Sequence, residues 1–196
     1  MVFATKNKGK IRELKAMLEG FNVKFISLDE YPDLPEIVED GKTFFENALK
    51  KAKAVSEYTG EIVLADDSGL EVDFLGGRPG VCSSRYAGPD ATDENNIEKL
   101  LEELKGVPIN KRDASFVCAL VLYRPDGTFE SFEGKWSGKI GHEPAGTAGF
   151  GYDPVFVVAE CGMTVAQLSP EMKNTMSHRA KALNELKKSL EKWVKA

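Results

Sequence analysis

The chain has 196 residues, enough to bury a substantial hydrophobic core as one large or two-lobed domain. Its hydrophobic content of 42% and charged content of 29% are ordinary for a globular protein, and its net charge of -5 argues against electrostatic binding of nucleic acid. Three widely spaced cysteines without a C-x-x-C pair indicate neither a zinc site nor a disulfide framework. Because no signal peptide or long apolar run is visible, we expect a soluble cytoplasmic protein with no membrane partner.

The N-terminal segment predicts a strand, a polar loop and a helix. Residues 1–5 are apolar, residues 6–10 are basic, and residues 11–20 carry apolar side chains on one helical face. A helix N-terminus placed after a strand offers N–H groups to an anion, and the loop adds polar and cationic side chains. The candidate anion-binding residues are Thr5, Lys6, Asn7, Lys8, Gly9 and Lys10. A solvated basic loop is the alternative interpretation, since the P-loop pattern is absent.

An acidic segment separates the next two predicted elements. Residues 22–28 are expected to form a strand, and a helix with capping-box spacing begins after Thr43. Between them, Glu36 and Glu39 lie in a proline-interrupted loop and are candidate metal ligands. Acidic residues in loops are commonly just solvated, which is the alternative.

The central feature is residues 62–70, where an apolar β-branched run is followed by Asp66, Asp67, Ser68 and glycine. The run predicts a buried strand that ends at the two carboxylates, where open α/β sheets bind their ligands. Two adjacent acids repel each other and lose solvation when enclosed, so a cation would stabilise them. A solvated Asp-Ser-Gly turn is the alternative, because all three residues are turn formers.

The second half of the chain predicts a hairpin and therefore a mixed sheet. A helix capped by Thr92 or Asp93 precedes residues 114–123. Odd and even positions of this segment are both apolar, which predicts a strand covered on both faces. A turn then leads into a more polar, aromatic strand at residues 128–140. A further short strand is expected at residues 155–158.

Two later stretches carry candidate ligand contacts. In the glycine-rich loop 143–154, Phe150 and Tyr152 offer flat faces for a base, although such aromatic residues often only pack the loop down. His178 and Arg179 are donors at the start of the final predicted helix. Together with the anion-binding loop and the carboxylate pair, they indicate a nucleotide phosphate with a divalent metal.

The sequence resembles the inosine triphosphate pyrophosphatase family, the Ham1/RdgB-like noncanonical purine NTP pyrophosphatases. The matching segments are Ala4-Thr5-x-Asn7-x-x-Lys10, Gly41-x-Thr43-Phe44 with Glu46-Asn47-Ala48, Ala65-Asp66-Asp67-Ser68-Gly69-Leu70-x-Val72-Asp73, Gly76-Gly77-x-Pro79-Gly80, Ser84-Arg85-Tyr86, Phe150-Gly151-Tyr152-Asp153-Pro154, and Ser177-His178-Arg179. They occur in the family's order and span almost the entire chain.

The resemblance implies a fold and an activity. The fold would be α/β, an elongated mixed sheet flanked by helices, with residues 1–196 forming one domain of two lobes and a nucleotide cleft between them. The protein would be a homodimer. It would hydrolyse ITP, dITP or XTP to the monophosphate and pyrophosphate with Mg²⁺.

The resemblance also implies roles for individual residues. Asp67 would serve as metal ligand and general base, with Glu39 as the second metal ligand and Glu36 as the alternative to Glu39. The implied substrate contacts are Thr5, Asn7 and Lys10 at the triphosphate, Ser68, and Phe150, Gly151, Tyr152, Asp153, Lys173, His178 and Arg179 around the purine and its ribose-phosphate. Lys6 departs from the pattern, because the family usually has glycine there; an added cation is compatible with triphosphate binding.

Two other functions would share parts of this pattern. A Maf-type nucleotide pyrophosphatase would prefer other bases, and the His178-Arg179 pair argues against it. A noncatalytic nucleotide sensor would keep the phosphate loop but would not need clustered acids, and the Asp66-Asp67 pair argues against that.

Overall fold

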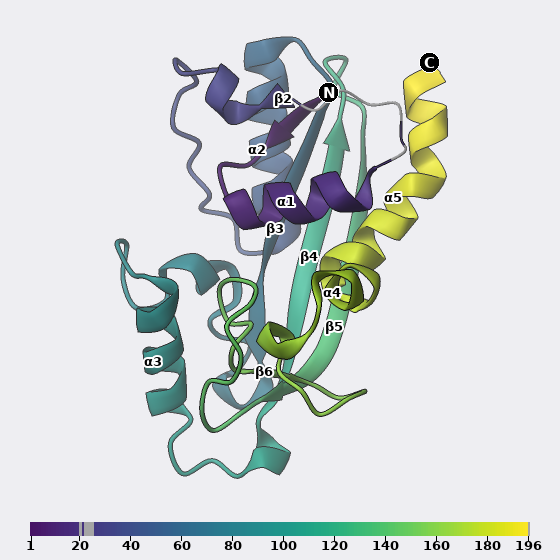
Figure 1. Cartoon of the computed structure of the whole chain (residues 1–196). Coiled ribbons are helices and arrows are strands. Elements are labelled where there is room, and N and C mark those ends of the chain that lie inside the picture. The colour runs from purple at the N-terminus through teal and green to yellow at the C-terminus, as the bar shows by residue number, and fades with distance from the viewer. Residues whose placement is uncertain (20, 22–25, 196) are drawn as a thin grey trace. The chain divides into compact units, whose positions relative to one another are not determined.

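The structure is a computed structural model that describes residues 1–19, 21 and 26–195, with side chains described up to residue 189. Its strands form a mixed sheet in the order β2-β1-β3-β4-β5-β6, flanked by helices (Figure 1). The strands are β1 (Val2–Ala4), β2 (Ile26–Ser27), β3 (Val63–Val72), β4 (Asp113–Tyr123), β5 (Phe129–Ile140) and β6 (Phe156–Val158). β1 is parallel to β2 and β3, whereas β5 and β6 are antiparallel, so the predicted mixed α/β sheet is confirmed.

Helices occupy the connections between these strands. They are α1 (Lys8–Met17), α2 (Phe44–Thr59), α3 (Asp93–Glu103), α4 (Pro170–Met176) and α5 (His178–Lys195), with 3-10 helices at Leu28–Glu30, Asp73–Leu75, Gly80–Arg85, Ile109–Lys111 and Val165–Gln167. The predicted caps Thr43 and Thr92 begin α2 and α3 by accepting backbone N–H groups, as sequence spacing indicated. Among the helices described, none is both long and apolar enough to cross a membrane.

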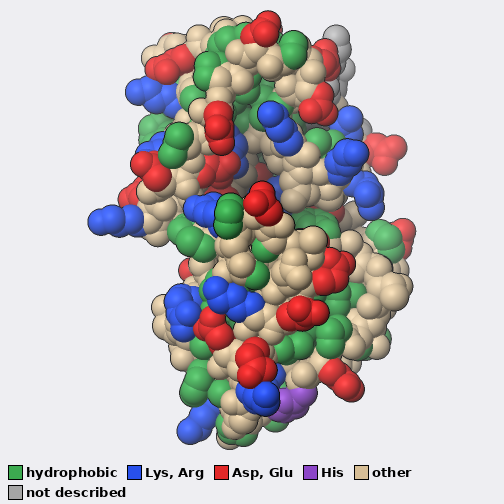
Figure 2. All heavy atoms as spheres, turned by 90° about the vertical axis from the view of Figure 1, so that its left-hand side faces the viewer, with side chains coloured by type: hydrophobic (Ala, Val, Ile, Leu, Met, Phe, Trp, Pro, Cys, Tyr) green, Lys and Arg blue, Asp and Glu red, His purple; other side chains and the backbone are tan. Residues whose placement is uncertain are grey.

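Contacts divide the chain into two compact units. Unit 1 comprises Met1–Asp67, Cys118–Gly134 and Arg179–Ala196, and unit 2 comprises Ser68–Val117 and Lys135–His178. The expectation of one domain with two lobes and a cleft between them stays a prediction. On the face displayed in Figure 2, basic and acidic side chains are interspersed.

The hydrophobic core of unit 1 explains why α1 and α5 pack against the sheet. Leu14 of α1 and Leu183 of α5 are fully buried in one cluster with Leu64 of β3 and Leu120 of β4. Both helices therefore bury their apolar stripes against the same face of the sheet. Leu186, one turn after Leu183 in α5, is fully buried in the same cluster.

Two predicted strand boundaries differ from the structure. Of the predicted strand 22–28, the described residues Ile26–Ser27 form β2 and Leu28 begins a 3-10 helix; residues 22–25 lie outside the described part of the chain. The prediction that the central strand ends at its carboxylates is wrong, because β3 continues to Val72. Sheet pairing with β4 overrides the turn propensity of Asp, Ser and Gly.

Unit 2 holds a buried arginine that satisfies the end of α3. Arg112 is 3% exposed, and its guanidinium donates to the carbonyl oxygens of Val107 at 2.9 Å, Gly141 at 2.6 Å and Leu104 at 2.7 Å. Leu104 is the C-cap of α3, where backbone carbonyls lack helical partners. The planar fork of donors suits these acceptors better than a single ammonium would.

We predict that Arg112→Met lowers the free energy of unfolding by roughly 3 kcal/mol or more, because it leaves buried carbonyls without donors. Urea denaturation followed by circular dichroism measures the loss, with the exposed neighbour Lys111→Met as the matched control. Equal midpoints for the two variants would contradict this role for Arg112.

Candidate active site

The predicted anion-binding loop connects β1 to α1, and Asn7 organises it. The Asn7 Oδ1 atom caps the helix by accepting the backbone N–H groups of Gly9 at 2.9 Å and Lys10 at 3.1 Å. The backbone N–H of Asn7 in turn donates to Thr5 Oγ1 at 3.1 Å. This cap starts α1 at Lys8, not at residue 11 as predicted. The sequence indicated that backbone N–H groups at the start of α1 would bind an anion together with side chains of the loop. Because the N–H groups of Gly9 and Lys10 already donate to Asn7, the side chains are the stronger candidates for anion contacts.

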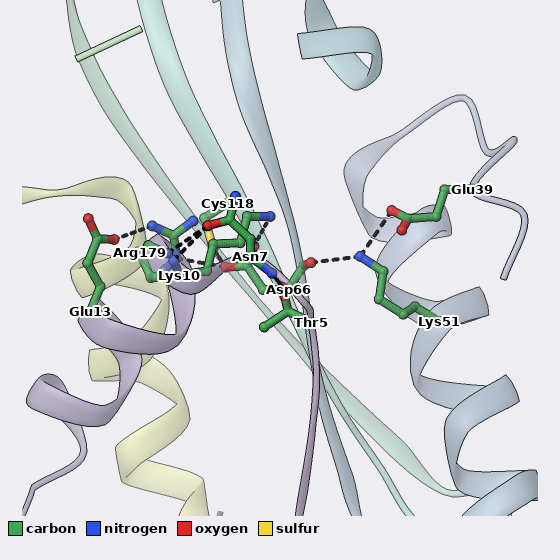
Figure 3. A network of polar contacts seen from close by, with 10 residues as sticks. Thr5, Asn7, Lys10, Glu13, Glu39, Lys51, Asp66, Cys118 and Arg179 are labelled. Atoms are coloured by element: carbon green, nitrogen blue, oxygen red, sulfur yellow. Dashed lines mark hydrogen bonds and ion pairs between the residues drawn. The ribbon is translucent and has the colours of Figure 1, made fainter. Parts of the chain in front are cut away.

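The Asp66 carboxylate lies at the centre of an ion cluster in unit 1 (Figure 3). It is 0% exposed, with Lys10 Nζ 2.5 Å from Oδ1 and Arg179 Nε 2.8 Å from Oδ2. The Cys118 thiol lies 3.2 Å from Oδ2, and Arg179 also pairs with Glu13 of α1. Two of the cationic residues that the resemblance assigns to the substrate, Lys10 and Arg179, are therefore joined by a carboxylate to which it gave no role.

Electrostatics explain why Asp66 stays charged in this position. Burial alone would raise the pKa of its carboxyl, but the charges and hydrogen bonds of Arg179 and Lys10 outweigh burial and hold the pKa well below its ordinary value. Burial, with the nearby Asp66 charge, raises the pKa of the Cys118 thiol well above its ordinary value. Cys118 is therefore an inert donor and not a nucleophile.

Asp67 has a different environment from its neighbour. Burial raises the pKa of its carboxyl, and the charge of Glu39 adds to the rise against the opposing effects of Lys10, Lys51 and a hydrogen bond with Asn47. Lys51 is 7% exposed, and its ammonium lies 3.0 Å from both Glu39 Oε2 and the backbone carbonyl oxygen of Asp66. Figure 3 shows Lys51 and Glu39 on the opposite side of the strands from Arg179 and Glu13.

The pair of Asp67 and Glu39 fits a magnesium ion by the chemistry of its donors. Mg²⁺ prefers oxygen ligands, takes one or two carboxylates, and completes its octahedron with water and substrate phosphates. In the described part of the chain, no group of three or more His, Cys, Asp or Glu side chains could hold a metal. A site with two carboxylates meets the magnesium preference without such a group. The charge of Glu39 acts on Asp67, whereas Glu36 is exposed; the choice of Glu39 as the second ligand stays a prediction.

A second cluster lies in the glycine-aromatic loop of unit 2. Asp153 is 3% exposed, and its Oδ2 accepts from the Phe150 backbone N–H at 2.9 Å and from Lys173 Nζ at 2.5 Å. The Lys173 ammonium also lies 4.5 Å from the centre of the Phe150 ring, a cation–π arrangement. Gly151 N–H donates to Asp93 Oδ2 at 2.6 Å. Phe150, Asp153 and Lys173 are thus brought together as the resemblance implied.

Tyr152 and His178 are placed in the core of unit 2. Tyr152 is 4% exposed and its hydroxyl donates to the Ser83 carbonyl at 2.8 Å, so it packs within unit 2; a contact between its ring and a base stays a prediction. His178 is 6% exposed and stacks on Phe116 with ring centres 5.0 Å apart. Ser68 is partly buried at the start of unit 2. Substrate contacts by His178 and Ser68 stay predictions.

The sequence reasoning missed two polar residues of the site, Lys51 and Glu13, and named Asp66 only as one of an acidic pair. Asp66 follows an apolar run immediately, so its burial was signalled by its position on the strand. Lys51 shares the buried face of α2 with Ala48 and Val55, and a lysine at such a core-facing position is unusual. Glu13 of α1 carried no comparable signal, since its partner Arg179 is remote in sequence.

The fold and site define an α/β protein with a basic loop that caps α1, a buried ion cluster around Asp66, and the neighbouring carboxylate of Asp67. The model of the Ham1 family matches residues 1–189. The chain is 53% identical to the dITP/XTP pyrophosphatase of Geobacter sulfurreducens over 190 residues, covering 97% of this chain and 96% of that protein. It is 50% identical to the dITP/XTP pyrophosphatase of Shouchella clausii over 192 residues, covering 97% and 96%.

Solved structures give the same result. A HAM1 protein from Coxiella burnetii aligns with a TM-score of 0.89 at 42% identity, covering 97% of this chain and 98% of that one. The Staphylococcus aureus Ham1 protein aligns with a TM-score of 0.87 at 43% identity, covering 97% of each chain. The protein belongs to the Ham1 family.

We predict that Gly149→Ala disrupts the Asp153 cluster. A Cβ on Gly149 would overlap the Asp153 carboxylate, and the backbone is left-handed there with φ at +83°. Gly162→Ala is the matched control, because φ is +69° and the space around that Cβ is open. In urea denaturation, Gly149→Ala should lose roughly 1.5–3 kcal/mol more than the control, the value of displaced charge-assisted hydrogen bonds. Equal losses would show that backbone strain alone matters.

Proposed function

We propose that the protein is a nucleoside-triphosphate pyrophosphatase that hydrolyses ITP, dITP and XTP to the monophosphate and pyrophosphate. The observation that carries this proposal is 53% identity, over 97% of the chain, to a protein named dITP/XTP pyrophosphatase. The protein would act as a homodimer in the cytoplasm, with Mg²⁺ as cofactor, and would remove these nucleotides from the pool.

In the proposed reaction, water attacks the α-phosphorus and pyrophosphate leaves. Positioning and charge stabilisation supply most of the rate enhancement in such phosphoryl-type transfers. Asp67 orients the water and accepts its proton, a role suited to a partly buried carboxylate with a raised pKa. Lys10, Thr5 and Asn7 hold the triphosphate. Bound Mg²⁺, held by Asp67 and Glu39, would supply charge neutralisation at the phosphate oxygens.

Base selection is proposed to depend on donors near the glycine-aromatic loop. Inosine and xanthine carry an oxygen acceptor at position 6, where adenine carries an amino donor. Lys173, whose ammonium lies against the Phe150 ring, and His178 would donate to this oxygen. An adenine would leave such buried donors unsatisfied, which discriminates strongly. Arg179 was also predicted to read the base, but its bonds to Asp66 and Glu13 favour a role on the phosphate side.

A nucleotide panel tests the proposed function. We predict that kcat/KM for ITP and XTP exceeds that for ATP by about 100-fold or more, with pyrophosphate as the product. Ion chromatography identifies the product. The same assay with a metal chelator added tests the requirement for Mg²⁺. Comparable rates with ATP, or release of orthophosphate, would contradict the proposal. Preference for modified pyrimidines would support the Maf-type alternative, and binding without turnover would support a sensor.

The role of Asp67 is tested by Asp67→Asn, which keeps the shape of the side chain and removes its charge. We predict that turnover of ITP falls by about 10²–10⁴-fold, the usual contribution of a positioned acid–base group. Asp33→Asn, the same change on an exposed loop of unit 1, is the control. A purified, folded Asp67→Asn protein with near-normal turnover would remove Asp67 from the mechanism.

A further inference from the structure

The buried carboxylate of Asp66 contacts the ammonium of Lys10 directly. Its Oδ2 atom accepts from Arg179 Nε at 2.8 Å and from the Cys118 thiol at 3.2 Å. Its Oδ1 atom then contacts Lys10 Nζ at 2.5 Å. Arg179 is itself braced by Glu13, which lies on the same helix as Lys10. The whole arrangement lies within unit 1.

The Lys10 side chain keeps some exposure to solvent although its partner has none. The Lys10 side chain is 13% exposed, whereas Asp66 is 0% exposed. An ammonium has three N–H donors, and a contact with one carboxylate oxygen uses one of them. Lys10 can therefore stay on Asp66 and still donate to a phosphate oxygen outside.

Two physical effects of Asp66 on anion binding oppose each other. The charges of Lys10, Arg179, Asp66 and Glu13 sum to zero, so removing the Asp66 charge would make the cluster cationic and attract an anion more strongly. Against this, a lysine has a flexible stem, and its freedom is lost when it binds a ligand. A lysine that is already held loses less.

We propose that Asp66 is a positioning residue for polyphosphate binding: it holds the Lys10 ammonium in the orientation in which its other N–H groups bind the outer phosphates. The inference rests on the proposed function only in assigning the triphosphate to Lys10. In this proposal, the benefit of holding Lys10 in place outweighs the repulsion between the Asp66 charge and the bound anion. The repulsion is small because the Arg179 guanidinium lies within hydrogen-bonding distance of the Asp66 carboxylate.

Calorimetry with inorganic tripolyphosphate tests the proposal without a base or a hydrolytic step. The variants are Asp66→Asn, Lys10→Met and the double variant. Asp66→Asn should weaken tripolyphosphate binding by about 3- to 10-fold, the effect of freeing one rotamer-rich side chain. It should have almost no effect when Lys10 is already methionine, and orthophosphate binding should change less than tripolyphosphate binding.

Several results would overturn the proposal. Equal or tighter binding by Asp66→Asn would mean that charge outweighs positioning, and equal losses with and without Lys10 would mean that Asp66 acts by another route. Failure of the wild-type protein to bind tripolyphosphate would overturn it as well. Tripolyphosphate binding without ITP hydrolysis would instead contradict only the proposed function. Glu57→Gln, which removes an exposed carboxylate in unit 1, is the control and should leave binding unchanged.

A measurement on the wild-type protein covers the case in which Asp66→Asn does not fold. The ammonium groups of lysines are observed by heteronuclear NMR, and the Lys10 signal is assigned from Lys10→Met. A slowly exchanging Lys10 ammonium in the ligand-free protein supports the proposal. An ammonium that exchanges as fast as that of the exposed Lys53 overturns it.

Discussion

A fully buried negative charge on β3 constrains unit 1 more than any other single feature. An unpaired carboxylate at the Asp66 position would cost several kcal/mol, so the fold must bring cations to it. Lys10 lies in the first turn of α1 and Arg179 in the first turn of α5, so neutralising Asp66 requires both helix starts to lie beside the strand. The apolar stripes of the same helices then pack on that face of the sheet. Charge pairing and hydrophobic burial thus require the same positions for α1 and α5 on the sheet.

The alternation of a β-strand separates two adjacent acids into two environments. Asp66 points to the face that α1 and α5 cover, where paired cations lower its pKa. Asp67 points the other way, toward Asn47 of α2 and Glu39, where burial raises its pKa. Titratable groups whose environments move their pKa values apart are typical of acid–base assignments. The carboxylate that stays firmly ionised supports structure, and the one with the raised pKa is suited to chemistry.

The sequence predicted what depends on local signals and missed what depends on burial and pairing. Side-chain caps such as Thr43 act within four residues, and the hairpin follows from strand periodicity, so both were found. The continuation of β3 past its acids depends on a partner strand about fifty residues later, which turn propensities do not report. The burial of Tyr152 was missed for a related reason, because its hydroxyl partner, Ser83, is remote in sequence. Residue patterns and the resemblance indicated the candidate site residues, whereas their mutual contacts came from the structure.

Each of the two units holds a lysine ammonium against a buried carboxylate. In unit 2, buried Asp153 holds the ammonium of Lys173 while a backbone amide holds the same carboxylate, much as Arg179 holds Asp66 while Asp66 holds Lys10. A cation fixed by a buried carboxylate adds little net charge, so it attracts anions weakly at long range and binds them well only where the geometry fits. The net charge of -5 and the interspersed surface charges in Figure 2 agree with this. For the proposed nucleotide substrate, selectivity would then come from placed donors and not from a positive surface that any polyanion could occupy.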